Sequence, residues 1–183
     1  MESLAGQFLI STPQMPDPRF REQVIYLCAH TEAGAMGLSV NNPNPHITLH
    51  DILRGAEMPV PEGEAAPVYF GGPVELEAGF ILFRAEAALH YAMEVQPGIF
   101  VSRDSRLLED IARGEGPEEF LFLLGYAGWG AGQLENELLD NGWLVVPADA
   151  EVIFRTPVEE KWKKAAGAFG IDITQLGDFI GNA

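Results

Sequence analysis

The order of apolar and polar positions predicts a chain of short strands and short helices. The segment 23–30 is apolar on both alternating faces, which is typical of a strand buried on both sides near the centre of a sheet. A turn over 31–35 leads into the apolar segment 36–40, so the two segments are predicted to form a hairpin. Further strands are predicted over 4–10, 67–70, 79–83, 98–102, 119–126 and 143–146, with a short one over 151–154.

Helices are predicted where a capping residue precedes a run with helical spacing. Thr48 and Asp51 resemble a capping box, and Asp104 precedes a second run. The clearest start is Thr156-Pro157, with Glu159 as the acidic partner, for a helix that runs to 169. Two more helices are predicted over 133–141 and 175–180.

The arrangement of these elements predicts the fold class. The first half of the chain is rich in hairpins and lacks regular β-α-β alternation. This favours an α+β fold with a mixed, largely antiparallel sheet over a doubly wound fold. Residues 1–183 contain no internal repeat and no long linker, so we predict a single domain.

Charge and composition narrow the classes of partner. Eleven Lys and Arg residues stand against 27 Asp and Glu residues, which gives a net charge of −16. Nucleic-acid binding depends on basic residues that displace counterions, so we expect no nucleic-acid partner. The one cysteine excludes an intrachain disulfide and fits a reducing compartment. The chain starts without a signal-peptide pattern and has no apolar run long enough to cross a bilayer, so a cytoplasmic protein without a membrane partner is expected.

Residues 125–143 contain five glycines and two tryptophans around one short acidic helix. Glycine is favoured where the backbone bends sharply or approaches another group closely. A helix that follows glycines is also able to bind a phosphate at its N-terminus, but Glu135 and Glu137 in the first turn would repel an anion. These two and Asp140 could act as acid or base, although an exposed helix prefers an acidic first turn in any case. We favour a packing role for the glycines, which let Trp129 lie tightly against the fold.

Several motifs occur in a fixed order along the chain: Leu-Ala-Gly-Gln-Phe-Leu-Ile at 4–10, Met-Pro-Asp-Pro-Arg-Phe at 15–20, Val-Tyr-Phe-Gly-Gly-Pro-Val at 68–74, and 125–135 with a tryptophan at 143. Together they resemble the bacterial YqgE/AlgH family over nearly the whole chain. The resemblance implies a compact α+β domain with a small closed β-barrel flanked by helices. It implies no established catalytic activity, cofactor or ligand, and the family name reflects a genetic link to the regulation of polysaccharide production.

Two pairs of side chains suggest chemistry by their spacing. Cys28 and His30 lie on the same face of a strand, and a thiol–imidazole pair is able to form a nucleophile. Their side chains start roughly 7 Å apart, however, so a buried, unreactive cysteine is favoured. His46 and His50 have the spacing of two metal ligands on a helix, but the predicted helix start at Thr48 leaves His46 outside it. We predict no metal site, no cofactor and no catalytic residue.

The candidates for a ligand site share a position at a strand end or in a glycine-rich segment: His30, Asn41, the turn Gly71-Gly72-Pro73, Trp129 and Gln133. If these segments meet, they form a cleft with backbone donors and a few polar side chains. The alternative is that they only satisfy the hydrogen bonds of turns and loops, and this alternative is slightly favoured.

The sequence therefore predicts a binding or regulatory module for a small molecule or a protein, with no oligomeric state specified. One alternative is an enzyme of unassigned reaction with a cleft near His30 and Gln133. A DNA-binding regulator is a third possibility, which the net charge disfavours.

Overall fold

The computed structural model describes residues 2–89, 91–168 and 170–174. Its strands are β1 (Gln7–Ser11), β2 (Val24–Thr31), β3 (Gly34–Ser39), β4 (Pro43–Thr48), β5 (Pro67–Phe70), β6 (Val74–Arg84), β7 (Met93–Gln96), β8 (Ile99–Ser102), β9 (Phe120–Gly130) and β10 (Trp143–Pro147). Its helices are α1 (Leu49–Gly55), α2 (Ser105–Ala112), α3 (Gln133–Leu139), α4 (Ala150–Phe154) and α5 (Lys161–Gly167), with short 3₁₀ turns η1 (Pro18–Phe20) and η2 (Val158–Glu160). Among the described residues, none of these helices combines the length and hydrophobicity that crossing a bilayer requires.

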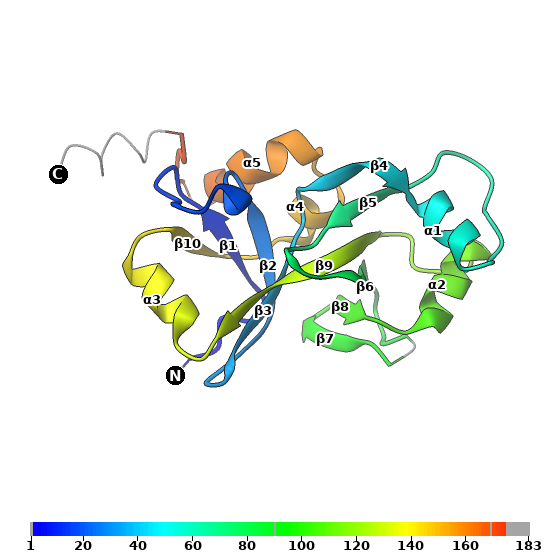
Figure 1. The fold of residues 1–183 in the computed structure, drawn as a ribbon, viewed down its shortest axis with the longest axis horizontal. Coiled ribbons are helices and arrows are strands. Elements are labelled where there is room, and N and C mark those ends of the chain that lie inside the picture. Colours follow the sequence, from blue (N-terminus) through cyan, green and yellow to red (C-terminus); the bar gives the residue numbers. More distant parts are fainter. Residues whose placement is uncertain (1, 90, 169, 175–183) are drawn as a thin grey trace.

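The strands form one curled sheet in the order β10-β1-β2-β3-β9-β6-β8-β7, with β5 also on β9 and β4 on β5 (Figure 1). All pairs are antiparallel except β5–β9, so the predicted α+β class and mixed, largely antiparallel sheet are confirmed. The prediction of a small closed barrel is wrong. Closure needs hydrogen bonds between the two end strands, whereas in the described residues β10 pairs only with β1 and β7 only with β8.

Strand β9 joins the two halves of the sheet, and Figure 1 shows it extending from one half into the other. Its first residues pair with β5 and β6, as in the pairs Val68–Phe122 and Phe83–Phe120. Its last residues pair with β3, from Ala127 to Gly130. The first glycines of the segment after residue 124 therefore belong to a strand.

Close backbone approach explains the glycines beside this strand. Gly71 N–H donates to the Leu124 carbonyl over 2.8 Å. A Cβ on Gly71 would lie 2.2 Å from Gly125 O, and a Cβ on Gly72 would lie 2.1 Å from Tyr126 C. Gly125 itself has a φ of +77°, which favours glycine. The segment after β5 can therefore lie against β9 only where side chains are absent.

Many local predictions are confirmed. The hairpin is β2–β3. Asp51 accepts a hydrogen bond from Thr48 N–H over 2.9 Å at the start of α1, and Asp104 accepts one from Arg106 N–H over 2.9 Å at the start of α2. A turn determines the hairpin and a capping residue determines the start of each helix, so all three signals are local.

Other predictions are wrong. The segment 151–154 belongs to helix α4, because the Asp149 carboxylate caps it by accepting a hydrogen bond from Glu151 N–H over 2.9 Å. The helix expected from Thr156 begins only at Lys161, after η2. Strands β4 and β7 were not predicted; β4 begins at a proline, which suits a strand that pairs on one side only. The predicted helix over 175–180 lies outside the described residues.

Two buried donors join helix α5 to β1, to α4 and to the residue after β3. Lys161 is 2% exposed, and its Nζ donates to Val40 O over 2.8 Å and to Ile153 O over 2.9 Å. Trp162 Nε1 donates to Ser11 O over 2.9 Å. Burial disfavours the charged amine and lowers the pKa of Lys161 to about 8.

Replacing Gly72 by alanine is expected to destabilise the protein by about 2 kcal/mol or more, because the new methyl group meets backbone rather than a movable side chain. The matched control is Gly167→Ala, where an added Cβ has open space in α5 and is expected to leave stability unchanged or raise it. Urea denaturation of both variants measures the difference. Equal stability of Gly72→Ala and the parent would contradict the close-approach argument.

Lys161 is expected to make stability depend on pH in an alkaline window. Its folded pKa of about 8 lies below the ordinary value of 10.5, so the unfolded chain binds the extra proton between these two values. The free energy of unfolding of the parent, minus that of Lys161→Met, should therefore rise by roughly 3 kcal/mol from pH 8 to pH 10.5. Other alkaline groups are common to both proteins and cancel. A difference that stays flat across this window would contradict the assignment.

Candidate functional site

A cavity of about 290 Å³ lies between α3, the end of β9 and the segment around η1. We call it the α3 cavity. Its aromatic wall consists of Phe20, Trp129 and Trp143, and the polar side chains that line it are Asp17, Arg19, Gln133, Glu137 and Asp140. A concave, largely aromatic wall with a few polar groups is the usual composition of a small-molecule site.

The Glu137 carboxylate is the centre of the polar contacts in this cavity. Its Oε1 accepts hydrogen bonds from Trp129 Nε1 over 3.3 Å and from Trp143 Nε1 over 3.1 Å, and its Oε2 accepts one from Gln133 Nε2 over 3.0 Å. The two indole rings are 6.2 Å apart in an edge-to-face arrangement. One side chain of α3 thus fixes both tryptophans, which come from β9 and β10.

The local sequence places α3 next to β9. Gly132 has a φ of +76° and stands at the N-cap, so the chain turns directly from the strand into the helix. Gln133 Oε1 accepts a hydrogen bond from Gly130 N–H over 3.0 Å, which joins the first residue of the helix to the last of the strand. Gln133 and Glu137 are one helical turn apart, so both side chains lie on one face.

Charges in the cavity are unevenly paired. Arg19 is held by Asp17, with Nη2 2.7 Å from Oδ2 and Nε 3.1 Å from each carboxylate oxygen. This contact lowers the pKa of the Asp17 carboxyl. Within the described part of the chain, Glu137 has no ion pair, because its three donors are an amide and two indoles. Asp140 adds a second carboxylate to the wall.

His30 lies outside the wall of the cavity but positions α3. It is 6% exposed on β2. Its Nδ1 accepts a hydrogen bond from Leu4 N–H over 3.0 Å, so Nε2 carries the ring proton and donates to Glu135 Oε1 over 2.7 Å. This hydrogen bond is the main reason that the pKa of Glu135 is lowered. The histidine therefore joins α3 to β2 and to the N-terminal segment.

The predicted site residues separate into two groups. Trp129 and Gln133 line the α3 cavity, and so does Pro73 of the predicted turn. Asn41, Gly71 and Gly72 do not line it. Asn41 Oδ1 accepts from Val24 N–H over 3.0 Å and its Nδ2 donates to a backbone carbonyl over 2.8 Å, while the two glycines lie against β9. These last contacts are the loop hydrogen bonds and packing expected from the structural alternative.

Other residues that line the cavity were not among the predicted site residues. Glu137 was considered only as a helix charge or an acid–base group, while Phe20, Arg19 and Trp143 were not considered as ligand contacts. The spacing of Gln133 and Glu137 was a usable signal, because it puts an amide and a carboxylate on one face of the helix. The approach of Phe20 to Trp143, with ring centres 5.6 Å apart, joins distant segments and carries no local signal.

The cysteine belongs to the core. Burial raises the pKa of the Cys28 thiol to about 12, and its Sγ donates to Tyr26 O over 3.6 Å. It stays protonated at neutral pH, which disfavours a nucleophilic role. Across residues 2–89, 91–168 and 170–174, no group of three or more His, Cys, Asp or Glu side chains is placed to hold a metal ion.

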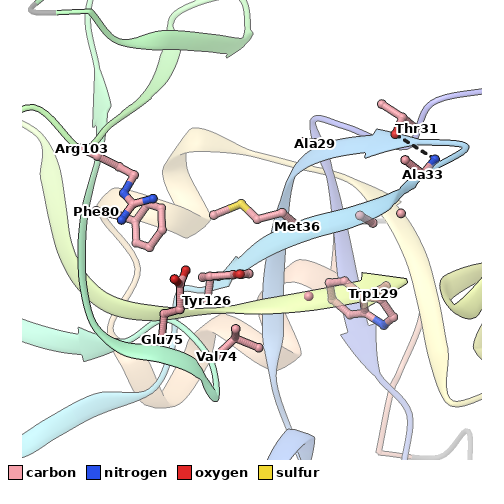
Figure 2. A pocket seen from close by; sticks show the side chains of 13 residues that line it. Ala29, Thr31, Ala33, Met36, Val74, Glu75, Phe80, Arg103, Tyr126 and Trp129 are labelled. Atoms are coloured by element: carbon pink, nitrogen blue, oxygen red, sulfur yellow. Dashed lines mark hydrogen bonds between the residues drawn. The ribbon is translucent and has the colours of Figure 1, made fainter. Parts of the chain in front are cut away.

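A second, more open hollow of about 570 Å³ adjoins the α3 cavity (Figure 2). Figure 2 shows Arg103 beside the Phe80 ring, with Met36 from β3 and Tyr126 from β9 nearby. The Arg103 guanidinium carbon is 4.9 Å from the centre of that ring. Val74, Gly128 and Trp129 line both hollows, which are thus neighbours along β9.

Comparison with known proteins identifies close relatives. A family model described as AlgH-like matches residues 8–174. A UPF0301 protein of Desulfotalea psychrophila is 47% identical, with 99% of this chain and 95% of the relative covered. A UPF0301 protein of Hahella chejuensis is 45% identical, with 100% and 98% covered.

Solved structures show the same fold. The solution structure of AlgH from Pseudomonas aeruginosa matches with a TM-score of 0.79 and 39% identity, over 94% of this chain and 92% of that one. A crystal structure of a Corynebacterium diphtheriae protein matches with a TM-score of 0.72, over 89% and 85% of the two chains. At 18% identity, the second likeness concerns the fold alone.

Replacing Glu135 by glutamine is expected to lower stability at neutral pH, because the His30 hydrogen bond then reaches a neutral acceptor. The folded pKa of Glu135 lies below its ordinary value of 4.5. The stabilisation by the carboxylate is therefore present above about pH 4.5 and is lost as pH falls through the lower folded value. Urea denaturation at pH 7, 5.5 and 4 should show the gap between parent and variant closing in acid.

The control for this measurement is Glu159→Gln, which changes the same charge at an exposed position in η2. It should give no gap at any of the three pH values. A gap for Glu135→Gln that persists unchanged at pH 4 would show that the His30 contact does not depend on the charge.

Proposed function

The chain belongs to the AlgH-like family, and we propose that it is a binding module whose small-molecule ligand occupies the α3 cavity. The observation that carries the proposal is the Glu137 carboxylate, on which Trp129, Trp143 and Gln133 converge inside a hollow of about 290 Å³. This volume is at the lower end of the range for small-molecule pockets.

Hydrogen bonds within the protein hold the walls of the cavity in place. Glu137 holds the two indoles, Gln133 joins α3 to β9, and His30 joins α3 to β2 through Glu135. Such a fixed wall supports small-molecule binding, because little conformational freedom remains to be lost when a ligand enters. A ligand that changes the contacts of α3 when it binds would alter the surface of the protein, and this is how the module would serve in regulation.

Two alternatives find less support. An enzyme that uses His30 is disfavoured because both ring nitrogens are hydrogen-bonded and the side chain is away from the cavity wall. A DNA-binding regulator is disfavoured by the net charge of −16.

A ligand-observed NMR screen of a metabolite library tests the proposal. We expect at least one compound to bind the parent and to lose binding in Gly142→Leu. Gly142 lines the cavity, and a Cβ there meets no atom closer than Met15 Cε at 3.5 Å, so a leucine starts without a backbone clash and is expected to narrow the cavity. Narrowing the hollow should weaken binding at least tenfold, a loss of about 1.4 kcal/mol.

The matched control is Gly167→Leu, the same substitution at an exposed position where an added Cβ has open space. It should leave binding unchanged. A screen without any hit, or hits that bind Gly142→Leu as well as the parent, would contradict the α3 cavity as the ligand site.

A further inference from the structure

Among the described residues, the Glu137 carboxylate has no counter-charge. Its side chain is half-buried, and the three groups that donate hydrogen bonds to it are two indoles and an amide, all neutral. Charged groups removed from water are normally paired with an opposite charge. Building on the proposed binding function, we infer that the ligand of the α3 cavity supplies this charge as a small substituted ammonium ion, such as a trimethylated amine.

The cation that already lines the cavity does not fill this role. Arg19 makes two-point contact with Asp17, and 64% of its side chain is exposed. Its guanidinium is engaged by Asp17 and by the Phe20 ring, whose centre is 5.5 Å from the guanidinium carbon, and the carboxylates of Glu137 and Asp140 leave the cavity with a net negative field. An anionic ligand would meet that field, whereas a cationic ligand is attracted by it.

The aromatic wall specifies the kind of cation. Phe20, Trp129 and Trp143 line the cavity, and adjacent rings lie edge to face with centres 5.6 and 6.2 Å apart. Aromatic rings attract cations, and clusters of them with a carboxylate recognise quaternary and methylated ammonium groups. A bare inorganic cation would have to give up a strong hydration shell to reach these rings, and this cost offsets the attraction. A substituted ammonium ion is less strongly hydrated and also gains from burial of apolar surface. Alkyl groups on the nitrogen supply that surface.

The hydrogen-bond geometry leaves the carboxylate able to bind a cation. In the part of the chain that the structure describes, Glu137 Oε2 accepts only from Gln133, so it retains acceptor capacity. The indole N–H groups point at Oε1, so binding at Oε2 does not require the tryptophans to move. A quaternary ammonium needs no direct hydrogen bond and is held by charge and ring contact alone.

Titration with choline chloride, compared with 3,3-dimethylbutan-1-ol, tests the inference. The alcohol has the shape of choline with a neutral carbon in place of the charged nitrogen. Two-dimensional NMR at constant ionic strength should show shifts of the Trp129 and Trp143 indole N–H signals with choline. The dissociation constant for the alcohol should be at least tenfold higher. Equal binding of the two compounds, or no indole shift with choline, would overturn the inference.

Variants locate the charge that is responsible. Glu137→Gln keeps an acceptor for the indoles and should weaken choline binding at least tenfold. Asp140→Asn changes an exposed position on the wall and should weaken choline binding several-fold. This variant replaces Glu137→Gln in the test if Glu137→Gln fails to fold. Arg19→Gln and the distant Glu159→Gln should not weaken it. Unchanged binding in both Glu137→Gln and Asp140→Asn would overturn the inference.

The two proposals fail in different ways. If library compounds bind in a manner sensitive to Gly142→Leu but choline does not, the cavity is a ligand site and the cationic class is wrong. If no compound binds at all, both proposals are wrong.

Discussion

Contact between two backbone segments sets the geometry of the whole sheet. The residues after β5 lie so close to β9 that Gly71, Gly72 and Gly125 have no room for side chains. This contact fixes where β9 passes from β5 and β6 to β3, and β9 in turn joins the halves of the sheet. The glycines are therefore needed above all for the close packing of the two backbone segments, and the hollows beside β9 depend on this packing.

From β9 the same constraint reaches the α3 cavity. Gly132 turns the chain from the strand into α3, and the helix then presents Gln133 and Glu137 to one side. Strand β10 pairs with β1, and this pairing places Trp143 next to the Glu137 carboxylate. Hydrogen bonds from three separate elements meet at one group, so the site is a product of the sheet order rather than of a single loop.

The sequence predicted elements with local signals and missed contacts between distant segments. The β2–β3 hairpin and the cap at Asp104 depend on neighbouring residues, and both were found. Trp129 and Gln133, both in the glycine-rich segment, line one hollow, and their role as ligand contacts stays a prediction. The meeting of Phe20 with Trp143 depends on the pairing of β1 with β10, which no spacing in the sequence reveals. The open form of the sheet is likewise a property of its end strands.

The pairing of β1 with β10 has a consequence for the order in which the protein is made. Residue 7 pairs with residue 147, and the outer edge of β1 has no other partner in the described sheet. On the ribosome this edge stays open until residues 143–147 have emerged, whereas β2 and β3 can close their hairpin early. Exposed strand edges invite pairing with other chains. Translation therefore passes through a stage at which this newly made N-terminal strand needs shielding, and that stage ends only when β10 arrives.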